Sequence, residues 1–188
     1  MKIAIVYHSG YGHTAEQAKA VARGAESVAG AEVVVISLSH GDVPWDALES
    51  ADAIIFGSPT YMGCISAPFK KFMDDSSKPW FEQKWKDKLA AGFTNSSGQS
   101  GDKLNTLQTL AIFAAQHSMI WVSLGLMPGN NSSKGSVEDL NRLGSFLGAM
   151  AQSNTDQGSE NAPIPSDLKT AEHLGKRVAT LAARFRHP

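Results

Sequence analysis

The chain has 188 residues and a mass of 20.0 kDa, and its 17 Lys and Arg residues nearly balance its 18 Asp and Glu residues. This balance leaves a net charge of −1 without a basic block, which argues against a nucleic-acid-binding surface and an anionic-membrane anchor. The single cysteine, Cys64, excludes an internal disulfide and a multi-cysteine metal site, and no apolar run is long enough for a signal peptide or a bilayer span, so we expect a cytoplasmic protein without membrane insertion.

Five short apolar runs, rich in β-branched residues, predict β-strands spaced along the chain. They cover residues 2–7, 33–38, 52–57, 89–94 and 119–124. Because each run is apolar on both of its faces, it is typical of a parallel strand that helices cover on both sides.

Helical patterns separate these runs. They cover residues 14–29, 44–49, 68–75, 103–117 and 166–185. The alternation predicts an α/β fold in one domain over residues 1–188, a three-layer sandwich with a five-stranded parallel sheet and helices on both faces. Residues 125–165 are rich in Gly, Asn and Ser, with a short helix expected near 136–147, and segments of this length are usually functional, oligomer-forming or disordered.

The turn after the first strand, residues 9–14 (SGYGHT), opens the first predicted helix. Ligands of an open α/β sheet bind beyond the carboxyl ends of its strands. The hydroxyl groups of Ser9 and Thr14, the backbone N–H groups and the positive end of the helix dipole together predict a phosphate site without a lysine. A plain tight turn capped by Thr14 is the alternative.

Other phosphate-binding motifs fit this turn less well. A nucleoside-triphosphate loop is excluded, because its motif requires a lysine and none lies between Lys2 and Lys19. The dinucleotide fingerprint is matched by Gly10, Gly12 and Ala15, but no acidic residue follows at the end of the second strand to bind a ribose. A mononucleotide with one phosphate remains, which points to FMN.

Two further loops follow the third and fourth strands, at residues 57–63 and 94–101. The carboxyl ends of parallel strands meet at one edge of a sheet, so we expect these loops to lie beside the first. The second loop would present its backbone to a flat heterocycle, with Tyr61 and Met62 packing beside it. The third loop is small and polar, and it suits the carbonyl and nitrogen edge of a ring. Taken singly, each loop also fits an ordinary surface turn.

Four motifs resemble the flavodoxin-like NAD(P)H:quinone oxidoreductases, the tryptophan-repressor-binding-protein family. They are SGYGHT at 9–14, AIIFGSPTYMG at 53–63, KLAAGFTNSSG at 88–98 and AAQHSM at 114–119. The resemblance implies a flavodoxin-like fold, non-covalently bound FMN, NADH or NADPH as the electron donor, a quinone or similar small acceptor, and a homodimer or homotetramer.

The resemblance also implies roles for individual residues. The FMN phosphate would be bound by Ser9, Gly10, Tyr11, Gly12, His13 and Thr14, the ring by Pro59, Thr60, Tyr61, Met62 and Gly63, and its pyrimidine edge with the ribityl chain by Asn95, Ser96, Ser97 and Gly98. Tyr61, Trp80 and His117 would line the substrate pocket. The family usually has Arg and Phe where Tyr61 and Met62 stand, and its insertion after the second strand is short here.

Two classes of function follow from these assignments. The first is an FMN-dependent oxidoreductase that passes two electrons from NAD(P)H to a quinone, with flavin-based chemistry, no catalytic side chain and no metal. The alternative is a flavodoxin-type electron carrier without its own small-molecule substrate. The net charge of −1 favours the enzyme, because carriers are strongly acidic to dock on basic partners. A flavin-free interaction module with the same fold is a third possibility.

Overall fold

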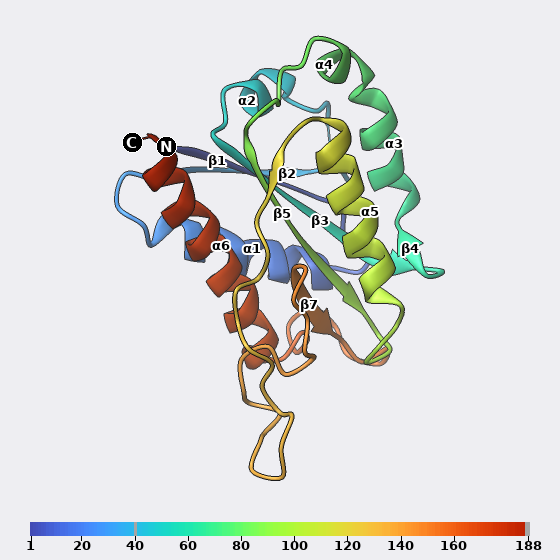
Figure 1. Ribbon diagram of the computed structural model, residues 1–188. Helices are drawn as coiled ribbons and strands as arrows, with labels where there is room; N and C mark the ends of the chain where they lie inside the picture. The colour runs from blue at the N-terminus through green and yellow to red at the C-terminus, as the bar shows by residue number, and fades with distance from the viewer. Residues whose placement is uncertain (40, 187–188) are drawn as a thin grey trace.

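The computed structural model describes residues 1–39 and 41–186, and it places a parallel β-sheet between two layers of helices (Figure 1). The strands are β1 (Lys2–Tyr7), β2 (Glu32–Ser37), β3 (Ala53–Tyr61), β4 (Cys64–Ile65), β5 (Leu89–Ser96), β6 (Ile120–Trp121) and β7 (Ala149–Gln152). Their order is β2-β1-β3-β5-β6 with parallel neighbours, while β7 also runs parallel to β5 and β4 pairs antiparallel with the end of β3. The predicted α/β class with a five-stranded parallel sheet is confirmed.

The helices divide between the two faces of the sheet. They are α1 (His13–Glu26), α2 (Trp45–Glu49), α3 (Ala67–Asp75), α4 (Ser77–Phe81), α5 (Lys103–Gln116) and α6 (Pro165–Arg186). Helices α1 and α6 cover one face, and α2, α3 and α5 cover the other (Figure 1). Within the described ranges, none of these helices combines the length and apolar character that a membrane span needs.

Residues of β1 show why the strands are apolar throughout. Ile3 and Ile5 belong to the core beneath α1 and α6, whereas Ala4 and Val6 belong to the core beneath α2, α3 and α5. Successive side chains of a strand point to opposite faces, so a strand covered on both sides needs apolar residues at every position.

The fifth strand position is divided between two short strands. β6 pairs with the start of β5 and β7 with its end, and residues 122–148 leave the sheet between them as the yellow and orange loop of Figure 1. The predicted strand at 119–124 is therefore only partly right, and β7 was missed because its sequence, AMAQ, has no β-branched residue. The helix expected near 136–147 is wrong, since Asn141 and Gly144 adopt left-handed conformations that interrupt a right-handed helix.

Two glycines allow α1 and α6 to cross at backbone contact. A Cβ atom built on Gly24 would lie 1.8 Å from the carbonyl oxygen of Glu172, and one built on Gly175 would lie 1.9 Å from that of Val21. Real Cβ atoms do not approach a carbonyl so closely, so any larger residue at either position has to push the helices apart.

We expect Gly175→Ala to lower the free energy of unfolding by about 2 kcal/mol, because overpacking against the main chain of α1 outweighs a gain in helix propensity of roughly 1 kcal/mol. Denaturant unfolding followed by circular dichroism measures the change. Lys176→Ala is the control, because this neighbouring side chain is exposed and its loss should change stability by less than about 0.5 kcal/mol. Equal stability of the two variants would contradict the tight crossing.

Candidate functional site

A cavity of about 540 Å³ lies at the carboxyl ends of β1, β3 and β5. Its volume falls within the roughly 300–1,000 Å³ that is typical of small-molecule sites. All three predicted loops contribute to its walls, through Ser9, Tyr11, His13, Thr14, Pro59, Thr60, Tyr61, Asn95, Ser96 and Ser97. The other predicted residues belong to the same loops without lining the cavity, and they are Gly10, Gly12, Met62, Gly63 and Gly98.

The first loop leaves backbone donors at the cavity. Gly12 precedes α1 in a left-handed conformation with φ of 89°, and the hydroxyl oxygen of Ser9 accepts the N–H of Ala15 at 3.2 Å. The N–H groups of His13 and Thr14 lie in the first turn of α1, where a helix has no acceptor of its own and its dipole is positive. The lining residues include no Lys, Arg, Asp or Glu. This end of the cavity therefore suits an anionic group held by neutral donors.

Tyr61, the last residue of β3, reaches across to the first loop. Its ring meets that of Tyr11 edge-on at a centroid distance of 6.2 Å, and a Cβ atom on Gly10 would lie 2.5 Å from its hydroxyl oxygen. Burial raises the pKa of Tyr61, so the hydroxyl stays protonated near neutral pH. Met62 follows with φ of 49° and is fully exposed. Tyr61 therefore closes the space between two loops, whereas Met62 lies outside it.

A cluster of buried hydroxyl groups fixes the wall between the second and third loops. The Oγ1 atom of Thr60 lies 2.8 Å from that of Thr94 and 2.7 Å from that of Thr106. These three residues come from β3, β5 and α5, so the cluster joins two neighbouring strands to the helix that covers them. The position of Thr60 at the cavity is therefore set by side-chain hydrogen bonds as well as by the sheet.

The third loop turns its carbonyl groups towards protein donors. The carbonyl oxygen of Ser96 accepts the N–H of Ser153 at 3.1 Å, and that of Ser97 accepts Nε2 of Gln152 at 2.8 Å. The carbonyl oxygens of Gly98 and Gln99 each accept Nζ of Lys103 at 2.8 Å. Lys103 was not among the predicted site residues, because a lysine at the start of an amphipathic helix gives no sign that it will be buried.

A fourth segment, which the sequence analysis missed, completes the cavity. It follows β7 and contributes Ser153, Asn154, Thr155, Gln157 and Gly158. Ser153 donates its hydroxyl to Oδ1 of Asn95 at 3.0 Å, and Nε2 of His13 lies 2.8 Å from the carbonyl oxygen of Gln157. Residues 153–158 are polar, as expected of a binding loop. Their place at the carboxyl edge of the sheet could be predicted only by recognising β7 as the strand that precedes them.

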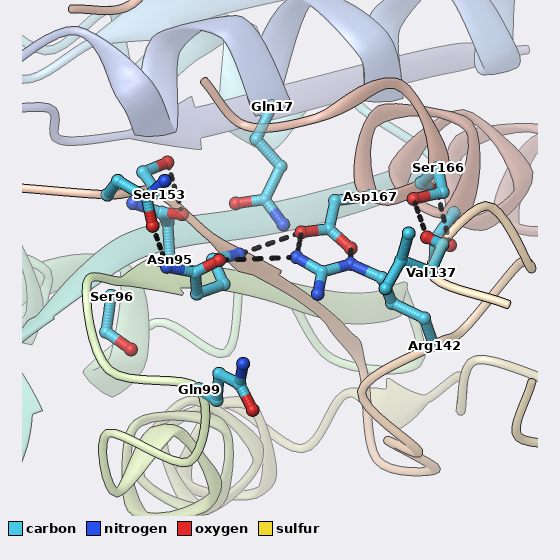
Figure 2. A network of polar contacts seen from close by, with 12 residues as sticks. Gln17, Asn95, Ser96, Gln99, Val137, Arg142, Ser153, Ser166 and Asp167 are labelled. Atoms are coloured by element: carbon cyan, nitrogen blue, oxygen red, sulfur yellow. Dashed lines mark hydrogen bonds and ion pairs between the residues drawn. The ribbon is translucent and has the colours of Figure 1, made fainter. Parts of the chain in front are cut away.

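A buried ion pair holds this fourth segment in place (Figure 2). Arg142 donates Nε to Oδ1 of Asp167 at 2.8 Å and Nη2 to Oδ2 at 2.7 Å, and the two side chains are only 7% and 1% exposed. Oδ2 of Asp167 also accepts the N–H of Gln152 at 2.9 Å. The pair thus connects the 122–148 segment and the start of α6 to the end of β7, directly before the cavity.

Trp80 and His117 are not brought to this cavity. They line a separate hollow of about 260 Å³. α5 begins behind the third loop and is about 21 Å long, because each of its 14 residues adds 1.5 Å. His117 follows the far end of this helix. His117 is only 3% exposed, and its ring stacks on that of Trp85 with a centroid distance of 4.1 Å. Its Nε2 atom lies 2.9 Å from Oγ of Ser76 and forms a hydrogen bond with it. Within one chain, these two residues therefore lie apart from the cavity and His117 packs in the core, so their expected role in a substrate pocket stays a prediction.

Comparison with known proteins places the chain among flavoproteins and their relatives. The family described as NADPH-dependent FMN reductase matches residues 1–132. Flavodoxin FldP of Pseudomonas aeruginosa is 45% identical over 187 residues, 98% of each chain. The NAD(P)H dehydrogenase (quinone) of Geotalea uraniireducens is 33% identical and covers 98% of this chain and 99% of its own. The crystal structure of a flavodoxin, WrbA-like protein from Agrobacterium tumefaciens aligns with a TM-score of 0.77 and 44% identity over 97% of this chain and 98% of that chain.

The buried His117 predicts a pH dependence of stability. Burial lowers its pKa from 6.5 to about 4, so the unfolded chain binds the proton first as the pH falls. The neutral ring therefore makes its full contribution to the free energy of unfolding above pH 6.5, and this contribution is lost as the pH falls towards 4. Between these values we expect the wild type to lose about 2 kcal/mol more stability than His117→Gln, which does not titrate. Denaturant unfolding at each pH measures the difference, and parallel pH profiles would contradict it.

Proposed function

The chain belongs to the NADPH-dependent FMN reductase family, and on this premise we propose that it binds FMN in the cavity and transfers electrons through it. Its flavodoxin-like fold is established by the match to the Agrobacterium tumefaciens structure. The observation that carries the proposal is the convergence of three strand-end loops and the 153–158 segment on one cavity, with the N-terminus of α1 at one end.

The donor set of the cavity fits the chemistry of FMN. Neutral N–H and hydroxyl donors at the first loop suit a phosphate, and hydroxyl and amide side chains of Asn95, Ser153 and Asn154 suit a chain of hydroxyl groups. The third loop has its carbonyl oxygens occupied from Ser96 to Gln99, so its backbone offers donors, which suit the acceptor-rich pyrimidine edge of a flavin.

Bound FMN would supply the redox chemistry by accepting and giving up electrons, and the protein would supply position and electrostatics. The first loop would bind the phosphate and thereby fix one end of the cofactor. Tyr61 stays protonated because burial raises its pKa, so it contributes an aromatic wall and a neutral hydroxyl donor rather than a charge. The third loop would offer its N–H groups to the acceptor-rich edge of the ring, where they would stabilise negative charge.

Of the two roles that the sequence leaves open, the flavodoxin-type electron carrier has the stronger support. The relative of 45% identity is named a flavodoxin, whereas the relatives named NAD(P)H dehydrogenase (quinone) are near 33%. Trp80 and His117, which the resemblance assigned to a substrate pocket, lie away from the cavity. The enzyme, which the net charge of −1 favours, therefore becomes the second candidate.

An NAD(P)H-dependent quinone reductase is the second candidate. It is favoured by several relatives of that name, each matched over nearly its whole length, and by a net charge of −1 instead of the strong acidity of carriers. In this role NADH or NADPH would donate electrons and a quinone would accept them. The homodimer or homotetramer expected from the resemblance stays a prediction for either role.

The two roles are separated by reduction of the FMN-loaded protein without oxygen. We expect dithionite to bleach its visible flavin absorbance and a protein acceptor such as cytochrome c to restore it, with NADH and NADPH ineffective. Rapid bleaching by NADPH followed by reoxidation with benzoquinone would instead establish the reductase. A colourless protein that takes up no FMN at micromolar concentration would overturn both roles.

A single substitution tests the phosphate end of the cavity. Gly12→Ala places a side chain at φ of 89°, and its Cβ atom would lie 2.8 Å from Ser159. We expect about tenfold weaker FMN binding, because left-handed strain costs roughly 1–2 kcal/mol at this position, and little change for riboflavin, which lacks the phosphate. Gly30→Ala is the matched control, since Gly30 has φ of 78° in open space at the far end of α1. Equal losses for FMN and riboflavin would contradict a phosphate site here.

A further inference from the structure

Lys103, the first residue of α5, is a lysine with no exposed surface directly behind the third loop. Its ammonium group donates three hydrogen bonds of 2.8 Å, to Oγ of Ser96 and to the carbonyl oxygens of Gly98 and Gln99. Lysine is almost never fully buried unless it is paired, yet all three acceptors are neutral. A cation at the start of a helix is also disfavoured by the helix dipole. The position is therefore costly to the fold.

The hydrogen bonds of Lys103 decide which groups the third loop can offer. Together with Gln152 and Ser153, it occupies every carbonyl oxygen from Ser96 to Gln99. Within the described residues, the backbone N–H groups of residues 97–99 donate no hydrogen bond to the protein. The loop thus presents N–H donors, and its ammonium partner Lys103 orients the carbonyl groups of Gly98 and Gln99.

The charges that face Lys103 are few. Asp167 of α6 attracts the ammonium group, Arg142 of the 122–148 segment repels it, and these two are paired with each other. β5, β7 and residues 97–101 hold no titratable side chain, and the neighbouring Asp102 is exposed. Burial is therefore the dominant influence, and it lowers the pKa of Lys103 to about 8. The group is charged at neutral pH and loses its proton in mildly alkaline solution.

We propose that Lys103 is a positioning residue for the bound flavin: it fixes the donor-only third loop and places one positive charge behind the cavity wall. The proposal rests on FMN being the ligand of the cavity. A neutral amine has two N–H donors in place of three, so deprotonation removes one of the bonds that hold the loop. An anionic ligand favours the protonated lysine. The affinity for FMN is therefore highest below the pKa that Lys103 has in the free protein, and it falls as the pH rises above that pKa.

Quenching of flavin fluorescence measures the dissociation constant for FMN from about pH 7 to about pH 9, on both sides of the pKa of about 8. We expect about tenfold weaker binding by the wild type at the alkaline end, because a hydrogen bond to a charged group is lost. Lys103→Met should bind FMN at least about tenfold more weakly at neutral pH and show no such step. Lys103→Arg keeps its charge over the whole range and should restore binding without the step.

A second readout is the midpoint potential of bound FMN at neutral pH. Reduction adds negative charge to the cofactor, so removal of the cation in Lys103→Met should make this potential more negative than in the wild type. Lys103→Arg should return the potential towards the wild-type value, which a merely structural role of the side chain would not require.

Lys88 provides a matched control at the opposite edge of the sheet. This half-buried lysine donates to the carbonyl oxygens of Glu49 and Ala51, near the start of β5. Lys88→Met removes the same kind of hydrogen bond, so it should lower stability while FMN affinity and its alkaline step stay unchanged.

The outcomes separate this inference from the proposed function. A wild type that binds no FMN overturns both. A wild type that binds FMN with the same affinity at both ends of the pH range overturns the role of Lys103 alone, and so does equal binding by Lys103→Met. The wild-type profile needs no variant, so a failure of Lys103→Met to fold leaves the test decisive.

Discussion

Burial of the sheet on both faces is the constraint on which the site depends. The residues of β1, β3 and β5 are almost all inaccessible to solvent, and helices cover both sides. Inside such a sheet the backbone is fully hydrogen-bonded, so unsatisfied polar groups can occur only where strands end. The carboxyl ends are the place where three loops leave the sheet together, and the cavity lies there.

The division of the fifth strand adds a further wall to this edge. Because the chain leaves the sheet after Trp121 and returns at Ala149, β7 delivers a polar segment beside β5 that one continuous strand would not have placed there. A return after a long excursion needs an anchor, and the buried pair of Arg142 and Asp167 provides it at the end of β7. A buried ion pair contributes little net stability on average. The role of this pair is therefore to fix the end of β7 in one position relative to α6 and the 122–148 segment.

The lining of the cavity includes no Lys, Arg, Asp or Glu, and the charged side chains of this region are buried behind the cavity wall. Neutral donors line the end of the cavity at the N-terminus of α1, whereas the side chains of Lys103, Arg142 and Asp167 are buried behind the cavity wall, where they hydrogen-bond to the third loop and to β7. In a medium of low dielectric such charges act over longer distances than they would in water. The arrangement can therefore influence a bound redox group without a direct contact that would have to break when the group changes charge.

The sequence by itself determined the α/β class, the positions of β1, β2, β3 and β5, those of every described helix except α4, and the three loops of the cavity. These features depend on periodicity and turn residues within short windows. Only the tertiary structure decided the burial of Lys103, the pairing of Arg142 with Asp167, the role of residues 153–158 and the distance of His117 from the cavity. Each of these depends on contacts between residues far apart in the chain. A local sequence pattern shows whether a residue is polar, but it does not show which distant residues will contact it in the folded protein.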